Sequence, residues 1–437
     1  MKLAVTAPDR LTVRTVPIPD PGDLIARLPH PSALAWIRHG EGIVGWGEAA
    51  RLTLPGGHDR FDAAARMLHD LFGAAAVDDT VNVPGSGPVA FGTFGFDPKS
   101  PDSTLIIPRR ILGRRDGRAW LTTIGDDTDP LTLANPPQPP TGLHWSDGAL
   151  PEHAWKHAVA TAVDRIRRGH LAPGTDPAQP GHPTAPPPRP THNTGHLGKV
   201  VLARDLTVRA DTPIDARVLL QRLAARFPGC YTFSCAGMVG ATPELLISRT
   251  GGDIESLVLA GTTARGTTPA DDQARAARLF TSAKDREEHR YAAEMVRDAL
   301  TPLCAHLTVP DEPELLTLPN VLHLASPLRG RLAADRSVLD VVAALHPTPA
   351  VCGTPTDTAM DLIRELEGMD RGRYAGPVGW VDARGDGEWG IALRCAEIDG
   401  TRARLFAGCG IVADSDPDAE LAEARTKFRP MQYALHG

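Results

Sequence analysis

The stretch FAGCGIVADSDPDAELAEARTK, residues 406–427, joins a predicted strand to a predicted helix. Its first part is an apolar run broken by glycines, which is typical of a strand whose backbone approaches another group closely. Asp416 suits the N-cap of a helix, and Pro417 suits its first turn. A strand followed at once by a capped helix predicts a fold in which helices pack on sheets.

The predicted helix carries three charged residues on one face. Glu420, Glu423 and Lys427 follow the spacing i, i+3, i+7, which keeps them in line. In one interpretation this is a solvated face with a Glu423–Lys427 ion pair. In the other the carboxylates hold a cation, because Mg²⁺ in proteins takes one or two carboxylates and leaves positions for an anionic substrate.

A second helix, predicted over Ser282–Leu300, offers another carboxylate. Ser282 followed by Asp285 resembles a capping box. Glu288 lies one turn before Ala292, in line with a stripe of apolar and small residues. It lies either at the solvent edge of the helix or inside the protein. In the second case it needs a cationic partner, because a lone buried carboxylate is costly.

Three further residues have a chemistry that the local sequence leaves open. Arg394 lies in the strand-like run IALRC, and its partner is a carboxylate of either the protein or a ligand. Lys199 begins the strand-like run KVVLARDL, and Glu244 follows a proline in ATPELL. Taken alone, Lys199 and Glu244 are typical of surface residues. The glycine-rich runs at 259–266 and 406–412 allow backbone amides to approach an anion.

Composition excludes several classes of protein. The chain has 437 residues, a formal net charge of −7 and no basic run, which argues against nucleic acid as a partner. The sequence shows neither a secretory signal nor the roughly 20 apolar residues of a membrane span, so we expect a cytoplasmic protein without a membrane partner. The six cysteines form no C-x-x-C pair, and we expect free thiols rather than zinc ligands or disulfides.

The order of predicted elements indicates an α+β fold. Strand-like and helical runs alternate after residue 199 without forming regular βαβ units, which favours helices on large, mainly antiparallel sheets. Residues 171–198 are rich in proline, glycine and histidine and have almost no large apolar residue. Such a segment cannot bury enough surface to offset its ordering entropy, so we expect a flexible surface loop.

A series of segments, taken in order, resembles the chorismate-utilising enzymes and, among these, the isochorismate synthases. The resemblance is dense from Lys199 onward and thin before about residue 85. The segments are FGTFGFDP (91–98), IIPRRILGRRDGRAWLT (106–122), KVVLAR (199–204), GATPELL (240–246), LAGTTARG (259–266), SAKDREEH (282–289), NVLHL (320–324), HPTPAVCG (346–353), YAGPVGW (374–380), IALRCAEI (391–398) and FAGCGIVADSDPDAELAEARTK (406–427).

The resemblance implies a single domain over residues 1–437, with a divergent N-terminal half (1–170), the loop (171–198) and a catalytic part (199–437). It implies two similar halves, each a large, mainly antiparallel sheet flanked by helices, with the active site in the cleft between them. The expected reaction is the Mg²⁺-dependent conversion of chorismate to isochorismate, which feeds siderophore or menaquinone-type biosynthesis.

The resemblance also assigns roles to individual residues. Lys199 matches the base that activates water for attack at C2 of chorismate, and Glu244 matches the acid that protonates the departing C4 hydroxyl. The residues matched to the metal are Glu288, Glu423 and Glu420, with Asp285 near them, and those matched to the substrate are Gly261, Thr262, His346, Ala350, Tyr374, Arg394, Gly408 and Lys427.

These roles place physical demands on the site. A lysine acts as a base near neutral pH only where burial or nearby cations lower its pKa. The glutamate must be protonated when the substrate is bound, which requires apolar or anionic surroundings that raise its pKa. The base and the acid must also face opposite sides of the substrate ring.

Single positions distinguish the related reactions. Anthranilate synthases typically have glutamine where Lys199 stands, and aminodeoxychorismate synthases have a nucleophilic lysine where Ala260 stands. Salicylate synthases tend to have threonine where Val351 stands but share the tyrosine at Tyr374. We therefore expect an isochorismate synthase that needs no glutaminase subunit, with salicylate synthase as the alternative. An inactive paralogue that acts as a binding subunit is disfavoured, because all catalytic matches are intact.

Overall fold

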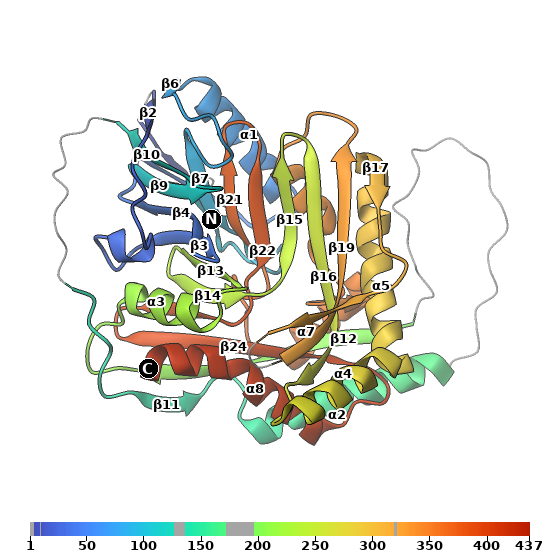
Figure 1. Ribbon diagram of the computed structural model, residues 1–437. Coiled ribbons are helices and arrows are strands. Elements are labelled where there is room, and N and C mark those ends of the chain that lie inside the picture. The colour runs from blue at the N-terminus through green and yellow to red at the C-terminus, as the bar shows by residue number, and fades with distance from the viewer. Residues whose placement is uncertain (1–3, 9, 126–135, 172–195, 319–320) are drawn as a thin grey trace.

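Two large β-sheets carry the fold (Figure 1). The computed structural model describes residues 4–8, 10–125, 136–171, 196–318 and 321–437, so most of the predicted loop at 171–198 lies outside the described residues. Every strand pair within them is antiparallel except one, which joins β2 (Thr12–Pro17) to β6 (Ala76–Asp79). The predicted α+β class with mainly antiparallel sheets is confirmed.

The first sheet contains strands from both ends of the chain, which meet where β7 pairs with β21. Its order in the described residues is β1 (Ala4–Thr6), β5 (Ala50–Leu54), β8 (Ser103–Ile107), β7 (Val89–Thr93), β21 (Pro377–Asp382), β22 (Gly387–Ile391), β15 (Leu245–Thr250), β16 (Asp253–Ala264), β19 (Val321–Leu332) and β17 (Cys304–Thr308), with β18 (Glu314–Thr317) also beside β19.

The second sheet is built in the same way, and its long strands β12 and β24 run across the direction of β16 and β19 (Figure 1). Because each sheet takes strands from before and after the loop, we propose that the two parts of the sequence form one folding unit. The order is β11 (His144–Asp147), β12 (Lys199–Arg209), β24 (Arg402–Ile411), β23 (Cys395–Asp399), β14 (Met238–Thr242), β13 (Tyr231–Cys235), β3 (Leu34–Arg38), β4 (Glu41–Trp46), β9 (Arg110–Arg115), β10 (Arg118–Ile124), β2 and β6, with β20 (Gly353–Thr354) beside β12.

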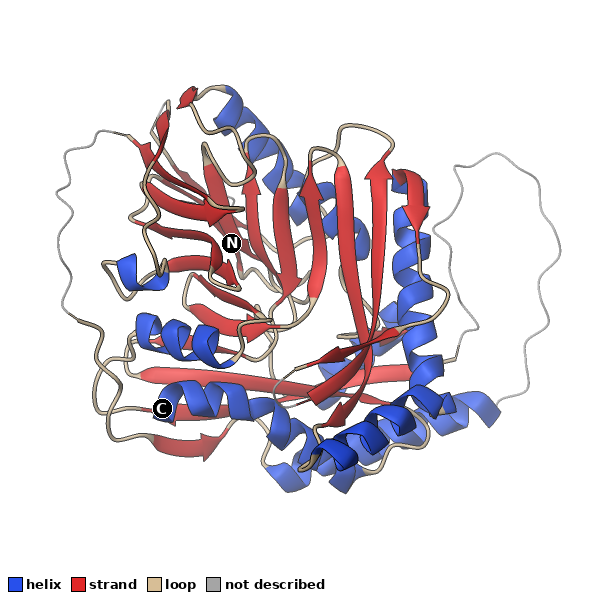
Figure 2. Ribbon diagram, viewed as in Figure 1, coloured by secondary structure: helices blue, strands red, loops and turns tan. Residues whose placement is uncertain are grey.

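The helices lie around the outside of the two sheets, as Figure 2 shows. Helix α5 (Ala283–Leu300) packs on β16 and β19, whereas α8 (Pro417–His436) packs on β24. None of the described helices is long and apolar enough to cross a bilayer. The helices are α1 (Arg60–Gly73), α2 (Glu152–Leu171), α3 (Ala216–Arg226), α4 (Pro269–Thr281), α5 (Ala283–Leu300), α6 (Val338–Leu345), α7 (Thr356–Leu366) and α8 (Pro417–His436), with short 3₁₀ turns at Ile25–Arg27 and Thr301–Leu303.

Both helices that carry the predicted acidic residues begin where the sequence predicts. The Asp416 carboxylate accepts hydrogen bonds from the amides of Asp418 (3.1 Å) and Ala419 (2.8 Å) at the start of α8. The Ser282 hydroxyl accepts one from the amide of Asp285 (3.2 Å) at the start of α5. These caps satisfy amides that have no partner within their own helix.

Apolar packing and a polar network join the sheets to their surroundings. Phe94, just after β7, packs between Phe61 of α1 (4.4 Å between ring centroids) and Trp389 of β22 (5.4 Å). The six cysteines are free thiols, as expected. The core is therefore held by packing without disulfides.

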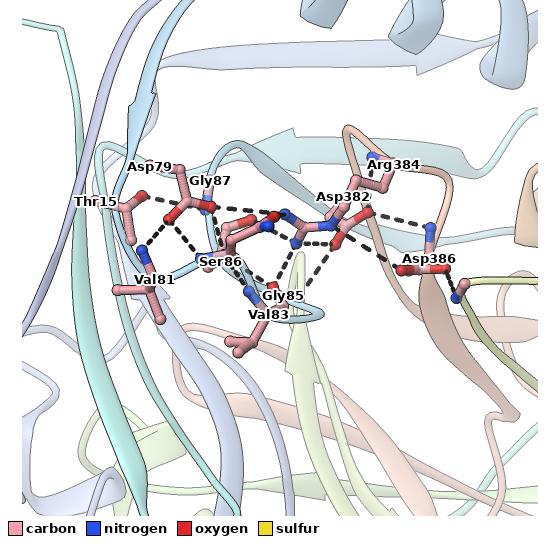
Figure 3. Close-up of polar contacts among 12 residues, drawn as sticks. Thr15, Asp79, Val81, Val83, Gly85, Ser86, Gly87, Asp382, Arg384 and Asp386 are labelled. Carbon is pink, nitrogen blue, oxygen red and sulfur yellow. Dashed lines mark hydrogen bonds and ion pairs between the residues drawn. The ribbon is translucent and has the colours of Figure 1, made fainter.

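Arg384, in the hairpin between β21 and β22, forms a polar link to the edge of the second sheet (Figure 3). Its guanidinium lies 2.6 Å from Asp382 and 3.6 Å from Asp79 of β6. Asp79 in turn accepts a hydrogen bond from the Ser86 hydroxyl, and Asp382 accepts one from the Gly85 amide. This network positions the two sheets relative to each other and is separate from the candidate site.

Candidate active site

A cavity of about 210 Å³ lies where the two sheets face each other. Strands β16 and β19 and helix α5 form its wall on the side of the first sheet, and β12, β24 and α8 form it on the other. All but one of the predicted site residues line it. They are Lys199, Glu244, Gly261, Thr262, Glu288, Ala350, Tyr374, Arg394, Gly408, Glu420, Glu423 and Lys427, and Asp285 lines it as well.

Lys199 and Glu288 meet inside this cavity. Lys199 is the first residue of β12, and its Nζ lies 2.7 Å from Oε1 of Glu288 on α5, with side chains that are 12% and 22% exposed. Gly410 leaves room beside them, because a Cβ at this position would stand 2.8 Å from Cε of Lys199. Glu288 therefore points inward and has the cationic partner that a partly buried carboxylate requires.

Glu244 follows β14 and is buried, with 7% of its surface exposed. Its backbone is held by a bond from its amide to the Thr242 hydroxyl and by one from the Ile391 amide to its carbonyl, each 3.2 Å. Burial raises the pKa of its carboxyl to about 7, although Arg394 and Lys199 act in the opposite direction. A large fraction of Glu244 is therefore protonated near neutral pH, as an acid catalyst must be.

The carboxylates of α8 form the most acidic part of the cavity. Oxygens of Glu420 and Glu423 and the sulfur of Cys409 all lie within 4.8 Å of one another. Burial raises the pKa of Glu423, but Lys427, 2.6 Å away, outweighs burial and keeps that pKa below its usual value. The charge of Glu288 opposes this effect, which places a third carboxylate nearby. The Glu423–Lys427 ion pair is present, but it faces the cavity rather than solvent.

Lys427 and Tyr374 both contact β24. Nζ of Lys427 donates to the Gly408 carbonyl at 2.8 Å. Burial alone lowers the pKa of Lys427, but the Glu423 carboxylate raises it above its usual value, so this ammonium stays charged. The Tyr374 ring stacks on Phe406 at 4.9 Å, and burial raises the pKa of its hydroxyl. Tyr374 can therefore donate a hydrogen bond as a neutral phenol.

Arg394 is the cavity cation that is best placed to meet a ligand. Its backbone has a φ of +49°, a conformation that costs a non-glycine residue about 1–3 kcal/mol and is common at functional sites. Within the described chain, its guanidinium makes no hydrogen bond or salt bridge. An arginine in a cavity without a protein partner suits a carboxylate ligand.

His346 is the one predicted site residue that the fold does not bring to the cavity. Its ring lies near Phe61 and Phe96, and its Nε2 is 3.1 Å from the Phe96 carbonyl. Burial lowers its pKa to about 3, and the charge of Arg60 adds to this effect. The chain turns between His346 and Ala350, so only Ala350 reaches the cavity wall. His346 is thus a neutral core residue.

His323, which is not among the predicted site residues, is the histidine that lines the cavity. It lies on β19 and lines the cavity, and its Nδ1 is 2.9 Å from the Thr262 hydroxyl. Its Nε2 is buried and has no hydrogen-bond partner among the described residues. Burial lowers its pKa to about 3, so the imidazole is neutral. The motif NVLHL contains this residue, and its position in a strand was the signal that could have identified it.

Comparison with known proteins gives a consistent result. The family model described as chorismate binding enzyme matches residues 190–436. Isochorismate synthase MenF of Bacillus subtilis is 42% identical over 380 residues, which cover 80% of this chain and 75% of that protein. The salicylate biosynthesis isochorismate synthase of Pseudomonas aeruginosa is 33% identical over 438 residues, which cover 92% of this chain and 84% of that protein.

A solved structure shares the fold. MenF, the menaquinone-specific isochorismate synthase from Escherichia coli, superposes with a TM-score of 0.76 over 98% of this chain and 95% of its own, at 24% identity. At this identity the likeness shows the fold alone. The arrangement of the two sheets is therefore shared with a protein of quite different sequence.

Proposed function

This chain belongs to the chorismate-binding enzyme family, and from that premise we propose that it is an isochorismate synthase. One observation carries the proposal: an amine, Lys199, and a buried carboxyl whose pKa is about 7, Glu244, line the same cavity. The reaction moves a hydroxyl between the ends of an allylic system, so it needs a base at one carbon and an acid at the other. The enzyme is thus an isomerase whose substrate is chorismate.

The residues of the cavity have different proposed roles in this reaction. Lys199 removes a proton from the water that attacks C2, and Glu244 gives a proton to the hydroxyl that leaves C4. Arg394 and Tyr374 bind the enolpyruvyl side of the substrate by ionic and hydrogen-bond contacts. The neutral His323 offers its unpartnered Nε2 to a polar group of the ring. Each positioned proton transfer contributes about 10²–10⁴-fold in rate.

The acidic part of the cavity fits Mg²⁺. Glu288, Glu420 and Glu423 offer oxygen donors, which this cation prefers. Burial raises the pKa of the Cys409 thiol well above its usual value, so it stays protonated and leaves the carboxylates as donors. When bound, Mg²⁺ supplies positive charge for the ring carboxylate of chorismate. We propose these three glutamates as its ligands, with Asp285 around them.

Product analysis tests the function directly. The protein is incubated with chorismate and Mg²⁺, with and without ammonia, and the products are separated by chromatography. Isochorismate as the product, independent of ammonia, supports the proposal. Salicylate and pyruvate would instead indicate a salicylate synthase, the alternative with which Tyr374 is consistent, and anthranilate would contradict both.

We expect the isochorismate to be used in siderophore or menaquinone-type biosynthesis. A cytoplasmic location and independence from nucleic acid, membrane and a glutaminase subunit stay predictions from the sequence.

The pKa of Glu244 predicts how activity depends on pH. Because the protonated form is the active acid, kcat/KM should fall about tenfold per pH unit above pH 7, the pKa of this group in the folded protein. The measurement is kcat/KM between pH 6 and 9 at saturating Mg²⁺.

The same pKa affects the stability of the fold. The pKa of Glu244 in the folded protein is raised above 4.5, so the stability that its protonated form provides is lost as pH rises through about 7. Melting temperatures at each pH separate the two effects, and a flat profile would contradict the assignment.

The metal assignment predicts a specific defect. Glu423→Gln should raise the Mg²⁺ concentration for half-maximal activity roughly 10- to 100-fold, the range found when metal-site groups are altered. Calorimetric titration of Mg²⁺ measures the same loss without turnover. Asp418→Asn on the same helix is the matched control, since that side chain is 77% exposed and pairs with Lys156. Equal Mg²⁺ affinity in both variants would remove Glu423 from the metal site.

A further inference from the structure

The outer edge of β12, the strand that begins with Lys199, is only partly covered by other strands. One side of β12 pairs with β24 along Val200–Arg209. On the other side β20 pairs with Lys199 and Val200, and β11 pairs with residues 206–209. Between them, neither Val201 nor Ala203 has a strand partner on this edge in the described part of the chain, although the Val201 amide donates to the Cys352 carbonyl, just before β20, at 2.8 Å. Their backbone groups need other partners, because buried unpaired amides and carbonyls are costly.

Side chains take the place of a strand at this gap. The Val201 carbonyl accepts a hydrogen bond from Arg371 Nη2 at 2.8 Å, and the Ala203 amide donates to Glu367 Oε1 at 2.7 Å. The Ala203 carbonyl accepts one from the Trp155 indole at 3.0 Å. Residues 201–203, next to the predicted base, are thus held by Glu367 at the end of α7 and by Arg371 in the loop after it.

Arg371 and Glu367 are themselves a buried ion pair. Their side chains are 2% and 1% exposed, and Nη2 of Arg371 lies 2.5 Å from Oε1 of Glu367. Arg371 Nε donates to the second carboxylate oxygen at 2.9 Å, and Phe96 lies 4.2 Å beneath the guanidinium. Such a pair adds little net stability, but it fixes geometry strongly, because breaking one partner leaves a buried charge.

Arg371 also bonds the loop beside β12, at a residue that lines the cavity. Its Nη1 donates to the Val351 carbonyl at 2.8 Å, and its own carbonyl accepts from the Tyr374 amide at 3.0 Å. Four hydrogen bonds therefore use four of its five N–H donors, whereas the Arg394 guanidinium in the same cavity makes none with the described residues. The guanidinium of Arg394 can therefore bind a ligand, whereas that of Arg371 is hydrogen-bonded to groups of the protein.

We propose that Arg371 and Glu367 form a positioning clamp, which holds the strand of Lys199 at a fixed distance from the loop of Ala350 and Val351. The clamp rests on the proposed function, since it sets the distance between the base and the enolpyruvyl side of the substrate. Arg371 borders the cavity, but its guanidinium is bonded to Glu367, Val201 and Val351, so we assign it as a positioning residue rather than a catalytic one.

Arg371→Lys tests the clamp, because lysine keeps the charge but cannot bond Val201, Val351 and both oxygens of Glu367 together. We expect kcat to fall about 10- to 100-fold, the scale of a small misplacement of a catalytic group. The Mg²⁺ requirement should not change, since the acidic ligands lie on other elements. Added guanidinium should restore part of the activity of Arg371→Ala. Arg249→Lys is the control: Arg249 and Asp386 are each 6% exposed and do not line the cavity, so this variant should lose stability without losing kcat.

Hydrogen exchange supplies a readout that does not depend on turnover. In Arg371→Lys and in Glu367→Gln, amides of residues 199–205 should exchange faster than in the parent, while those of β16 should not. The clamp would be overturned if the parent forms isochorismate and both variants keep the kcat and the amide exchange rates of the parent. Failure of the parent to form isochorismate would instead reject the proposed function, and the exchange result would still decide whether the clamp exists. If Arg371→Lys does not fold, the isosteric Glu367→Gln carries the same measurements.

Discussion

Lys199→Ala is expected to lower kcat for isochorismate formation by about 10²–10⁴-fold, the contribution of one general base. The amine is the predicted base and lies 2.7 Å from Glu288 within the cavity. Chorismate should still bind, because Arg394, Tyr374 and the metal-binding carboxylates remain. Steady-state kinetics and equilibrium binding of chorismate measure the two effects separately.

The same variant should not weaken the binding of Mg²⁺. Removal of the Lys199 side chain takes away a group that bonds the Glu288 carboxylate at 2.7 Å and competes with Mg²⁺ for it, so the Mg²⁺ affinity should stay equal or increase. Lys156→Ala is the matched control, since Lys156 is exposed and pairs with Asp418 outside the cavity. Full turnover in Lys199→Ala would reject Lys199 as the base, and a lost Mg²⁺ affinity would show that it serves the metal site instead.

Glu244→Gln should cause a loss of similar size, about 10²–10⁴-fold in kcat, because glutamine has the shape of the protonated acid but cannot transfer its proton. Mg²⁺ affinity should be unchanged, since Glu244 lies outside the group formed by Glu420 and Glu423. Any residual activity should also lose the decline above pH 7.

Glu388→Gln provides the comparison for Glu244→Gln. Glu388 is also largely buried, at 19% exposure, and pairs with Arg115 and Trp36 away from the cavity lining. Its replacement should lower the melting temperature but leave kcat near that of the parent. If Glu244→Gln and Glu388→Gln reduce kcat equally, the loss reflects stability rather than acid catalysis.

The sequence by itself predicted the class of fold and the ends of the helices that carry the acidic residues. Asp416 and Ser282 cap α8 and α5 as predicted, because capping depends on residues two or three positions away. Glu423 and Lys427 pair as helical spacing requires. The order of the motifs identified the family, which the comparisons confirm, and single positions such as Ala260 and Val351 led to the proposed reaction.

The tertiary structure decided which side chains share the cavity. Local sequence left the places of Glu288, Lys199 and Glu244 open, and only the tertiary structure brings the start of β12 to α5 and joins the first two at 2.7 Å. It also placed His323 rather than His346 in the cavity wall. The physical reason is that burial and long-range pairing depend on how the two sheets face each other, whereas caps and helical spacing depend on neighbours along the chain.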